Sequence, residues 1–207
     1  MRPLLPDGFE PVPFAGYGES SATLYVMGAH VDAALIPASV GAASFGFLFA
    51  VVTVPERYQT EGANGYVVSL HAVTDEARLA AAFSAGGLDM GSGSVDVERA
   101  GTGILTGTFD SDVQGVQLEV AGEALANPRA RPQEFPARVF GVRDGVVTGI
   151  YDIEVAEHTA ISSEMRLSLA AEGPLGALET LATPGTGVFA DAPSLSFTPV
   201  PLPDGGT

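Results

Sequence analysis

Residues 45–54 read FGFLFAVVTV, an apolar run rich in aromatic and β-branched side chains. Such residues favour strands, and a run that is apolar on both alternating faces is typical of a strand buried on both sides. The uncharged segment extends back to Asp32, but Pro37 and several small residues interrupt it. The dense run has about half of the roughly 20 residues that a membrane helix requires. We therefore predict a central buried strand and no membrane span.

The segment that follows predicts a second strand and then a helix. Residues 66–73 (YVVSLHAV) have the composition of a strand, and a polar hairpin joins them to the first strand. Residues 74–84 predict the one clear helix, because Thr74 suits the N-cap position and the alanine-rich stretch after it has high helix propensity. Gly86 and Gly87 then end the helix.

The rest of the chain is expected to form short strands separated by turns, since 15 prolines and 26 glycines are spread along it. The expected elements are strands at residues 21–27, 94–98, 103–109, 113–121, 138–142, 147–155, 163–169 and 194–200, turns at 110–111 and 144–145, a helical turn at 32–36 and a second helix at 175–181. Prolines predict an extended arm over residues 1–16, and a flexible tail is expected at 201–207. We predict one domain over residues 1–207, of the β-dominated α+β class, folded as a barrel or a curved double sheet.

Composition excludes several classes of function. The chain has 25 acidic residues against nine arginines and no lysine, for a formal net charge of -16. Such a surface repels phosphate backbones and anionic membranes, so we expect no nucleic-acid and no membrane partner. The absence of cysteine excludes disulfides, thiolate nucleophiles and cysteine-based zinc sites. The N-terminal residues do not have the pattern of a signal peptide, so we expect a cytoplasmic protein.

Four stretches of the sequence, in this order, carry a resemblance to a known family. They are AALIPASV with FGFLFAVVTV (residues 33–40 and 45–54), GYVVSLHAVTDEARLAAAF (65–83), SVDVERAGTGILTGTF (94–109), and RLSLAAEGPLGALETL with FADAPSLSFTPVPL (166–181 and 189–202). In order and spacing they resemble the acetoacetate decarboxylase superfamily, whose fold is a cone-shaped β-barrel with an internal pocket. The resemblance implies a cone-shaped antiparallel β-barrel or double sheet with one or two short helices, and assembly as a homo-oligomer.

The signature of that family, Gly-x-Pro-Lys-Lys, supplies the lysine that forms an imine with the keto acid. At the matching position this chain has Gly87, Leu88, Asp89, Met90 and Gly91, so the glycine is kept and both lysines are replaced. An imine nitrogen accepts the electrons that decarboxylation releases, and methionine cannot form an imine. The lysine-dependent chemistry of the family is therefore not expected here.

His71, within YVVSLHAV, is the main candidate for acid–base chemistry. Strand alternation places it on one face with Val67, Ser69 and Val73, and if that face lines the barrel interior, His71 could act near neutral pH. The alternative is a histidine that is hydrogen-bonded within the core or exposed on the sheet. Glu119, in VQLEVAG, is a second candidate, because a carboxylate that points into an apolar barrel has a raised pKa.

Asp89 and Met90 are candidates through their position, since the resemblance places this segment along the pocket. Asp89 would move protons, and Met90 would contact an apolar substrate. Arg57 and Arg138 are predicted to bind substrate because cations are scarce and a carboxylate-bearing ligand needs one, unless they only offset the acidic surface. Tyr66, on the strand of the candidate histidine, completes the predicted substrate-binding set. No spacing in the chain is diagnostic of a metal or cofactor site, and we expect neither.

Together these features favour a lysine-independent lyase or cyclase that acts on a small apolar or keto-bearing, polyketide-like metabolite in an internal barrel pocket. A place in secondary metabolism is implied by the resemblance alone. Protons would move through His71, Glu119 or Asp89 in a pocket that holds the substrate in a reactive conformation. Two alternatives are a non-catalytic ligand-binding or carrier protein with the same pocket, and a structural protein whose barrel is filled by side chains.

Overall fold

The computed structural model describes residues 2–12, 24–36, 38–63, 65–99, 104–111, 116–124, 137–155, 159–170, 173–178 and 185–203. The strands are β1 (Glu10–Pro11), β2 (Leu24–Ile36), β3 (Ala38–Thr53), β4 (Gly65–Thr74), β5 (Gly91–Arg99), β6 (Ile104–Ser111), β7 (Val116–Ala124), β8 (Ala137–Arg143), β9 (Val146–Val155), β10 (Thr159–Ala170) and β11 (Gly185–Pro199). The helices are α1 (Ala77–Ala85), α2 (Gly173–Gly176) and the 3-10 helices η1 (Arg2–Leu4) and η2 (Glu56–Tyr58).

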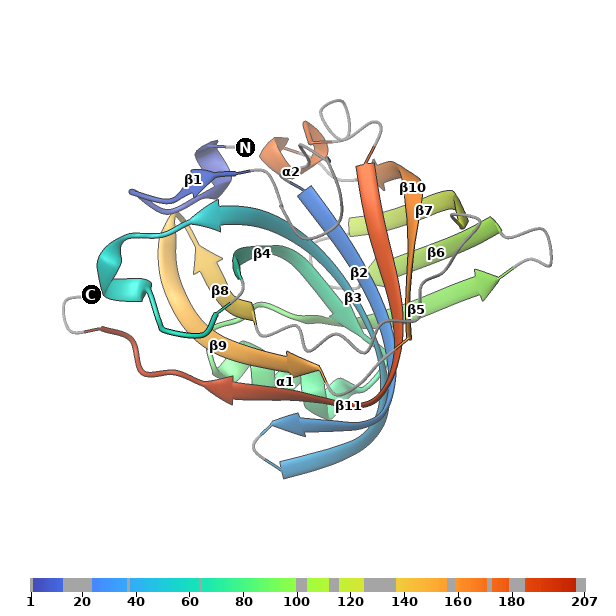
Figure 1. Cartoon of the computed structure of the whole chain (residues 1–207), viewed down its shortest axis with the longest axis horizontal. Coiled ribbons are helices and arrows are strands. Elements are labelled where there is room, and N and C mark those ends of the chain that lie inside the picture. The colour runs from blue at the N-terminus through green and yellow to red at the C-terminus, as the bar shows by residue number, and fades with distance from the viewer. Residues whose placement is uncertain are drawn as a thin grey trace.

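The strands form two closed rings that share four members. Strands β2, β3, β4, β8, β9 and β11 pair in a cycle and close a six-stranded barrel. Strands β5, β6, β7 and β10 connect β4 to β11 by a second route, which closes a larger ring through β2 and β3. In Figure 1, these four strands lie on one side of the long strands β2, β3 and β11, and β8 and β9 lie on the other. The predicted β-dominated barrel is confirmed, although β2–β11, β4–β5 and β4–β8 pair in parallel.

The two rings separate at β4 and at β11, because each of these strands changes partner along its length. The ladder between β4 and β8 ends at the pair Val68 and Phe140, and the ladder between β4 and β5 begins at Val73 and Gly91. Residues 69–72 of β4 belong to neither ladder, although β3 still pairs along their other edge. This interruption, which we call the β4 gap, lies beside the turn that follows α1.

A β-bulge in β4 changes which residues share a face. Leu48 of β3 lies opposite His71, whereas the next residue, Phe49, lies opposite Ser69, so that Leu70 is an extra residue in β4. A bulge interrupts the alternation of side chains between the two faces of a strand. The predicted common face is therefore wrong, because Val67 and Val73, which simple alternation places together, pack in different hydrophobic clusters.

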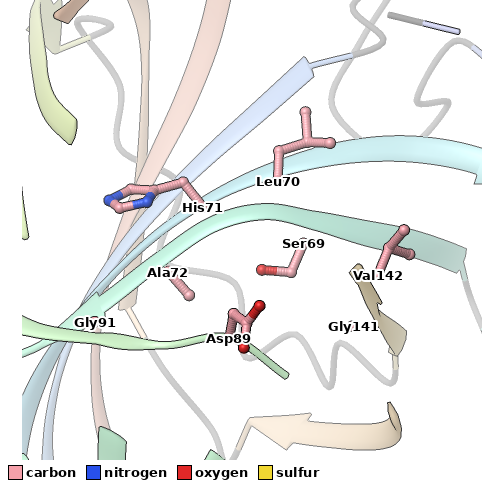
Figure 2. A pocket seen from close by; sticks show the side chains of 8 residues that line it. All are labelled: Ser69, Leu70, His71, Ala72, Asp89, Gly91, Gly141 and Val142. Carbon is pink, nitrogen blue, oxygen red and sulfur yellow. The ribbon is translucent and has the colours of Figure 1, made fainter. Parts of the chain in front are cut away.

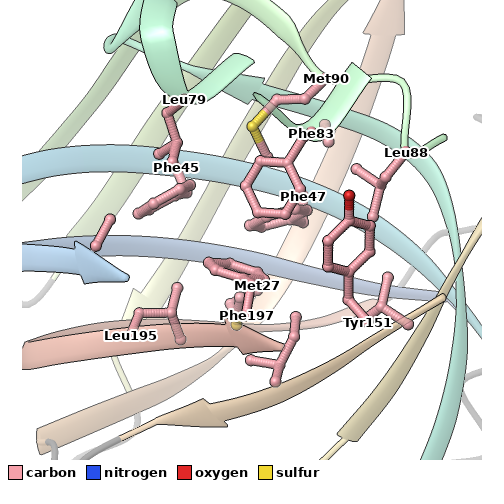
Figure 3. Packing of buried hydrophobic residues seen from close by; sticks show 14 of the residues in the cluster. Met27, Phe45, Phe47, Leu79, Phe83, Leu88, Met90, Tyr151, Leu195 and Phe197 are labelled. Atoms are coloured by element: carbon pink, nitrogen blue, oxygen red, sulfur yellow. The ribbon is translucent and has the colours of Figure 1, made fainter. Parts of the chain in front are cut away.

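The first of these clusters, the barrel core, lies inside the six-stranded barrel and contains side chains from all six strands and from α1. Figure 3 shows Met27, Phe45 and Phe197 among them. Its members are Met27, Val31, Ala34, Ala43, Phe45, Phe47, Phe49, Val51, Val67, Ala72, Leu79, Ala80, Phe83, Leu88, Met90, Val139, Tyr151, Ile153, Leu195 and Phe197. The ring of Phe47 stacks between Phe45 and Phe49, at centroid distances of 5.9 and 4.9 Å. Burial of such aromatic side chains is a major contribution to core stability.

The second cluster, the outer core, covers the other face of the barrel strands. Its buried members are Leu5, Phe9, Leu24, Leu48, Ala50, Val52, Val54, Tyr58, Val68, Val73, Phe140, Val147, Ile150, Leu175 and Leu178. Odd-numbered residues of β3 from Ala43 to Val51 therefore enter the barrel core, and even-numbered residues from Leu48 to Val52 enter the outer core. The prediction of a central strand that is buried on both faces is confirmed.

Helix α1 begins later than predicted and ends as predicted. The side chain of Glu76, and not that of Thr74, caps the helix by accepting a hydrogen bond from the Arg78 N–H. The Thr74 hydroxyl instead accepts a hydrogen bond from the N–H of Glu76, the residue just before the first helical residue. Gly86 is the C-cap, and Gly87 has a φ of +84°, a conformation that glycine adopts without strain.

Several other predicted boundaries are wrong. Residues 32–36 continue β2 rather than forming a helical turn, because β3 and β11 pair with β2 on both sides. Residues 110–111 end β6, the second helix is Gly173–Gly176, and the N-terminal arm pairs with β3 through Pro11 and Val52. Residues 1, 13–16, 21–23, 103, 113–115, 179–181 and 204–207 of the predicted segments lie outside the described residues. Among the described residues, no helix is long and apolar enough to span a membrane.

Candidate functional site

A small cavity lies at the β4 gap, beside the filled barrel. Its volume is about 40 Å³, and residues 69–72 of β4, Asp89, Gly91, Gly141 and Val142 line it (Figure 2). A buried water needs about 10–15 Å³ of such volume, so the cavity has room for roughly three waters or for a ligand group of that size. Inside the six-stranded barrel the described side chains of the barrel core pack against one another, and this cavity lies beside them.

Two buried polar atoms of the lining residues have no hydrogen-bond partner. They are the Ser69 hydroxyl oxygen and the His71 Nε2. His71 is only 5% exposed. A buried polar atom without a partner destabilises a protein by about 1–3 kcal/mol, so such atoms are uncommon outside sites that bind water or a ligand. The β4 gap is therefore the strongest candidate for a binding site among the described residues.

Burial determines the protonation state of His71. Desolvation lowers its pKa from 6.5 to about 4, because the charged imidazolium loses its hydration inside the protein. The imidazole is therefore neutral at pH 7. In Figure 2, His71 and Leu70 lie on one side of β4, and Ser69 and Asp89 lie on the other. This arrangement follows from the bulge, so the gap presents polar groups of both faces of β4.

Asp89 forms the wall opposite β4, and an arginine holds its carboxylate. Arg143 donates from Nε to Oδ2 at 3.2 Å and from a terminal nitrogen to Oδ1 at 2.5 Å. The Asp89 carboxylate raises the pKa of Arg143, mainly through these hydrogen bonds. The two charges balance one another, so this pair leaves no net charge at the gap.

Close glycine contacts fix the position of the Asp89 segment. Gly141 and Gly149 lie opposite each other in the β8–β9 ladder, and the turn at Gly87 crosses over them. A methyl group on Gly141 would collide with the Gly87 carbonyl and with the backbone of Leu88. The Thr148 hydroxyl also donates a hydrogen bond of 2.5 Å to that carbonyl. The strand ladder, the turn and the hydroxyl together determine where Asp89 lies.

His71 and Asp89 are the two predicted site residues that the structure brings to the same cavity. Met90 follows Asp89 directly but is 2% exposed and packs in the barrel core, so it does not line the cavity. Glu119 lies in β7, at a register position opposite Thr108 of β6 and Ser168 of β10.

The three predicted substrate-binding residues other than Met90 are Tyr66, Arg57 and Arg138, and none of them lines this cavity. The Tyr66 hydroxyl is hydrogen-bonded to the main chain of Thr60. Arg138 donates to both oxygens of Asp152, at 2.7 and 2.8 Å. Arg57 is exposed and lies over the ring of a neighbouring tyrosine, 4.9 Å from its centre.

Ser69 and Gly141 are site residues that sequence reasoning missed. Ser69 was placed on the face of His71 without a role, and Gly141 is one of many glycines in the chain. Both residues lie where β4 changes partner from β8 to β5. That position depends on pairing between segments far apart in the chain, which a local sequence pattern does not contain. Within the described ranges, no group of three or more histidine or acidic side chains could hold a metal ion.

Comparisons with known proteins give weak similarity in structure and none in sequence. No protein-family model and no curated protein matches the chain. The enduracididine biosynthesis enzyme MppR complexed with pyruvate matches with 14% identity over 90% of this chain and 76% of MppR, at a TM-score of 0.45. The complex of MppR with the condensation product of pyruvate and imidazole 4-carboxaldehyde matches over 89% of this chain and 74% of MppR, with 14% identity and a TM-score of 0.43.

Acetoacetate decarboxylase from Legionella pneumophila is also similar, with 13% identity and a TM-score of 0.35. That match covers 66% of this chain and 56% of the decarboxylase. At these identities and TM-scores, we take no activity from any of these proteins.

Proposed function

We propose that the chain is a lysine-independent lyase or cyclase of the acetoacetate decarboxylase-like superfamily, acting on a small keto-bearing compound at the β4 gap. The observation that supports this most directly is the buried His71, whose Nε2 has no protein partner. An imidazole in this state is available to a ligand, because it has no competing hydrogen bond to break.

The roles of the residues in this proposal follow from the chemistry of a carbonyl compound. Neutral His71 accepts a proton from the carbon next to the carbonyl, or donates a hydrogen bond to the carbonyl oxygen, depending on its tautomer. Negative charge then develops on that oxygen, and hydrogen-bond donors stabilise it without an imine. The Ser69 hydroxyl lies on the other side of β4 from His71. We therefore assign this role to main-chain N–H groups on the edge of residues 69–72 that neither β5 nor β8 pairs.

The size of the cavity limits which part of a substrate it holds. About 40 Å³ accommodates one functional group rather than a whole polyketide-like molecule. We therefore place the reactive carbonyl at the gap and the remainder of the substrate outside it. Assembly as a homo-oligomer stays a prediction.

A non-catalytic binding or carrier protein is the second candidate, and the pKa of His71 favours it. A general base works best when its pKa lies near the working pH, and a pKa of about 4 makes His71 a weak base at pH 7. The same unpartnered atoms would then hold a ligand without transferring a proton. Binding without proton exchange would be the signature of this alternative.

Hydrogen–deuterium exchange on small keto compounds distinguishes the two candidates. Pyruvate, acetoacetate and acetone would be incubated with the chain in D₂O, and deuterium at the carbon next to the carbonyl followed by NMR. We expect catalysed exchange of at least one compound, and a fall of about 10²–10⁴-fold in the His71→Gln variant. His30→Gln is the control, since His30 is exposed and lies outside the cavity. Equal exchange by wild type and His71→Gln would exclude His71 as the base.

A further inference from the structure

The β4 gap has an unused main-chain edge. On each edge of a strand, alternate residues present both an N–H and a C=O group. The ladder with β8 stops at Val68 and the ladder with β5 starts at Val73, so the edge of residues 69–72 that faces the cavity has no strand partner. Unpaired main-chain groups of this kind bind extended ligands by completing the ladder. The gap therefore offers hydrogen-bond donors and acceptors side by side.

Charge and hydrogen-bonding capacity at the gap favour one kind of ligand group. The only acidic side chain that lines the described cavity is Asp89, and Arg143 already balances it. The Ser69 hydroxyl, directed to the same side of β4 as Asp89, can both donate and accept (Figure 2). An ion would lose its hydration here without meeting an unpaired opposite charge, whereas a neutral group that both donates and accepts would satisfy this surface.

We propose that the β4 gap binds a neutral carboxamide group of the ligand, which pairs with the free edge of residues 69–72 and with the Ser69 hydroxyl. The three heavy atoms of a carboxamide match the volume of roughly three waters available there. The main chain of Gly141 forms one wall of the cavity. It packs so closely against the turn at Gly87 that a side chain at position 141 would collide with that turn. Because the cavity holds one functional group, the carbonyl at the gap is then that of the carboxamide, and the keto group of the substrate lies outside the cavity. The inference deepens the proposed function by naming an amide-bearing keto substrate, and it rests on that function only for the reaction that follows binding.

Fragment titrations test this binding without any turnover. The full-length chain, labelled with ¹⁵N, would be titrated separately with acetamide, acetate and methylammonium, three probes of similar size and different charge. We expect acetamide to cause saturable shifts of the amide signals of residues 69–72 and Gly91, with little change from the two ions. Preference for either ion, or acetamide shifts that leave these signals unchanged, would overturn the proposal.

Two substitutions at Ser69 distinguish the contribution of its hydroxyl from the effect of filling the cavity. Ser69→Val fills part of the cavity and removes the hydroxyl, and we expect acetamide affinity to fall at least about tenfold, which corresponds to 1.4 kcal/mol. Ser69→Ala leaves the space open, and a several-fold loss is expected even if the valine variant folds poorly. Ser94→Val, at an exposed position of β5 outside the cavity, is the matched control and should bind as the wild type does.

These outcomes are independent of those for catalysis. Loss of deuterium exchange in His71→Gln with acetamide binding retained would support both proposals. Acetamide binding in a chain that exchanges no keto compound would leave the amide site standing and remove the proposed reaction. Unchanged acetamide affinity in both Ser69 variants would overturn the proposed role of the hydroxyl, whatever the activity.

Discussion

His71 links the candidate site to the stability of the fold. Its folded-state pKa of about 4 lies below the unfolded-state value of 6.5, so between these values the unfolded chain binds a proton that the folded chain does not. The stabilising contribution is complete above about pH 6.5 and is lost as the pH falls toward 4. At about 1.4 kcal/mol per pKa unit, the loss amounts to roughly 3 kcal/mol.

The pH dependence of unfolding tests this linkage. We expect the free energy of unfolding of the wild type, measured with denaturant between pH 7 and 4.5, to fall more steeply than that of His71→Asn. The comparison removes the contribution of carboxylates, which titrate in both proteins. His30→Asn is the control variant, because His30 is exposed and lies outside the cavity. A wild-type slope in His71→Asn would show that His71 is not held neutral by burial.

Sequence patterns predict His71 and Asp89 as site residues, but they do not predict the surroundings of either side chain. His71 was found because imidazole is the usual acid–base group near neutral pH, and Asp89 because of its place in the family resemblance. The same resemblance places Met90 at the pocket, but its side chain packs in the barrel core. The role of Ser69 depends on whether a neighbouring strand pairs with it, which no local pattern specifies.

The turn after α1 packs on the β8–β9 hairpin through glycines, so this contact is sensitive to any added side chain. Gly141→Ala would place a methyl group against the Gly87 carbonyl and the Leu88 backbone. Overpacking of this kind destabilises by roughly 1–3 kcal/mol. We therefore expect a loss of that size in denaturant unfolding, together with weaker acetamide binding because the cavity wall moves.

A substitution on the same hairpin provides the comparison for Gly141→Ala. Val146 is 54% exposed and follows the hairpin turn, so Val146→Ala should change stability by less than about 0.5 kcal/mol. Equal free energies of unfolding for Gly141→Ala and the wild type would mean that the turn can shift away from the hairpin without destabilising the protein.

Strands were easier to predict than their relations to one another. β3 and β4 follow directly from the apolar runs at residues 45–54 and 66–73, because composition and periodicity are local properties. The bulge at Leu70 and the change of partner from β8 to β5 depend on register between segments far apart in the chain. Residues 32–36 were misassigned for the same reason, since pairing with β3 and β11 overrides their local preference.

The double-ring architecture predicts uneven protection of main-chain amides. Strand β3 pairs with β2 and β4, and its central residues are buried on both faces. We expect these amides to exchange with solvent only through global unfolding, and some amides of residues 69–72 to exchange faster through the β4 gap. Native-state hydrogen exchange followed by NMR measures both. Uniform protection along β4 would contradict the gap, and acetamide should slow the faster amides.

The shared strand β11 also determines when the fold can be completed during synthesis. β11 pairs with β2 and β10 near its start and with β9 near its end, so it closes both rings. Ribosomes make the chain from its N-terminus, and Gly185–Pro199 emerge after every other strand of either ring. Until then the phenylalanines of β3 lack the partner strand that brings Phe197 against them. Until β11 has been made, the nascent chain therefore carries an exposed aromatic surface, a state in which chaperones protect proteins from aggregation.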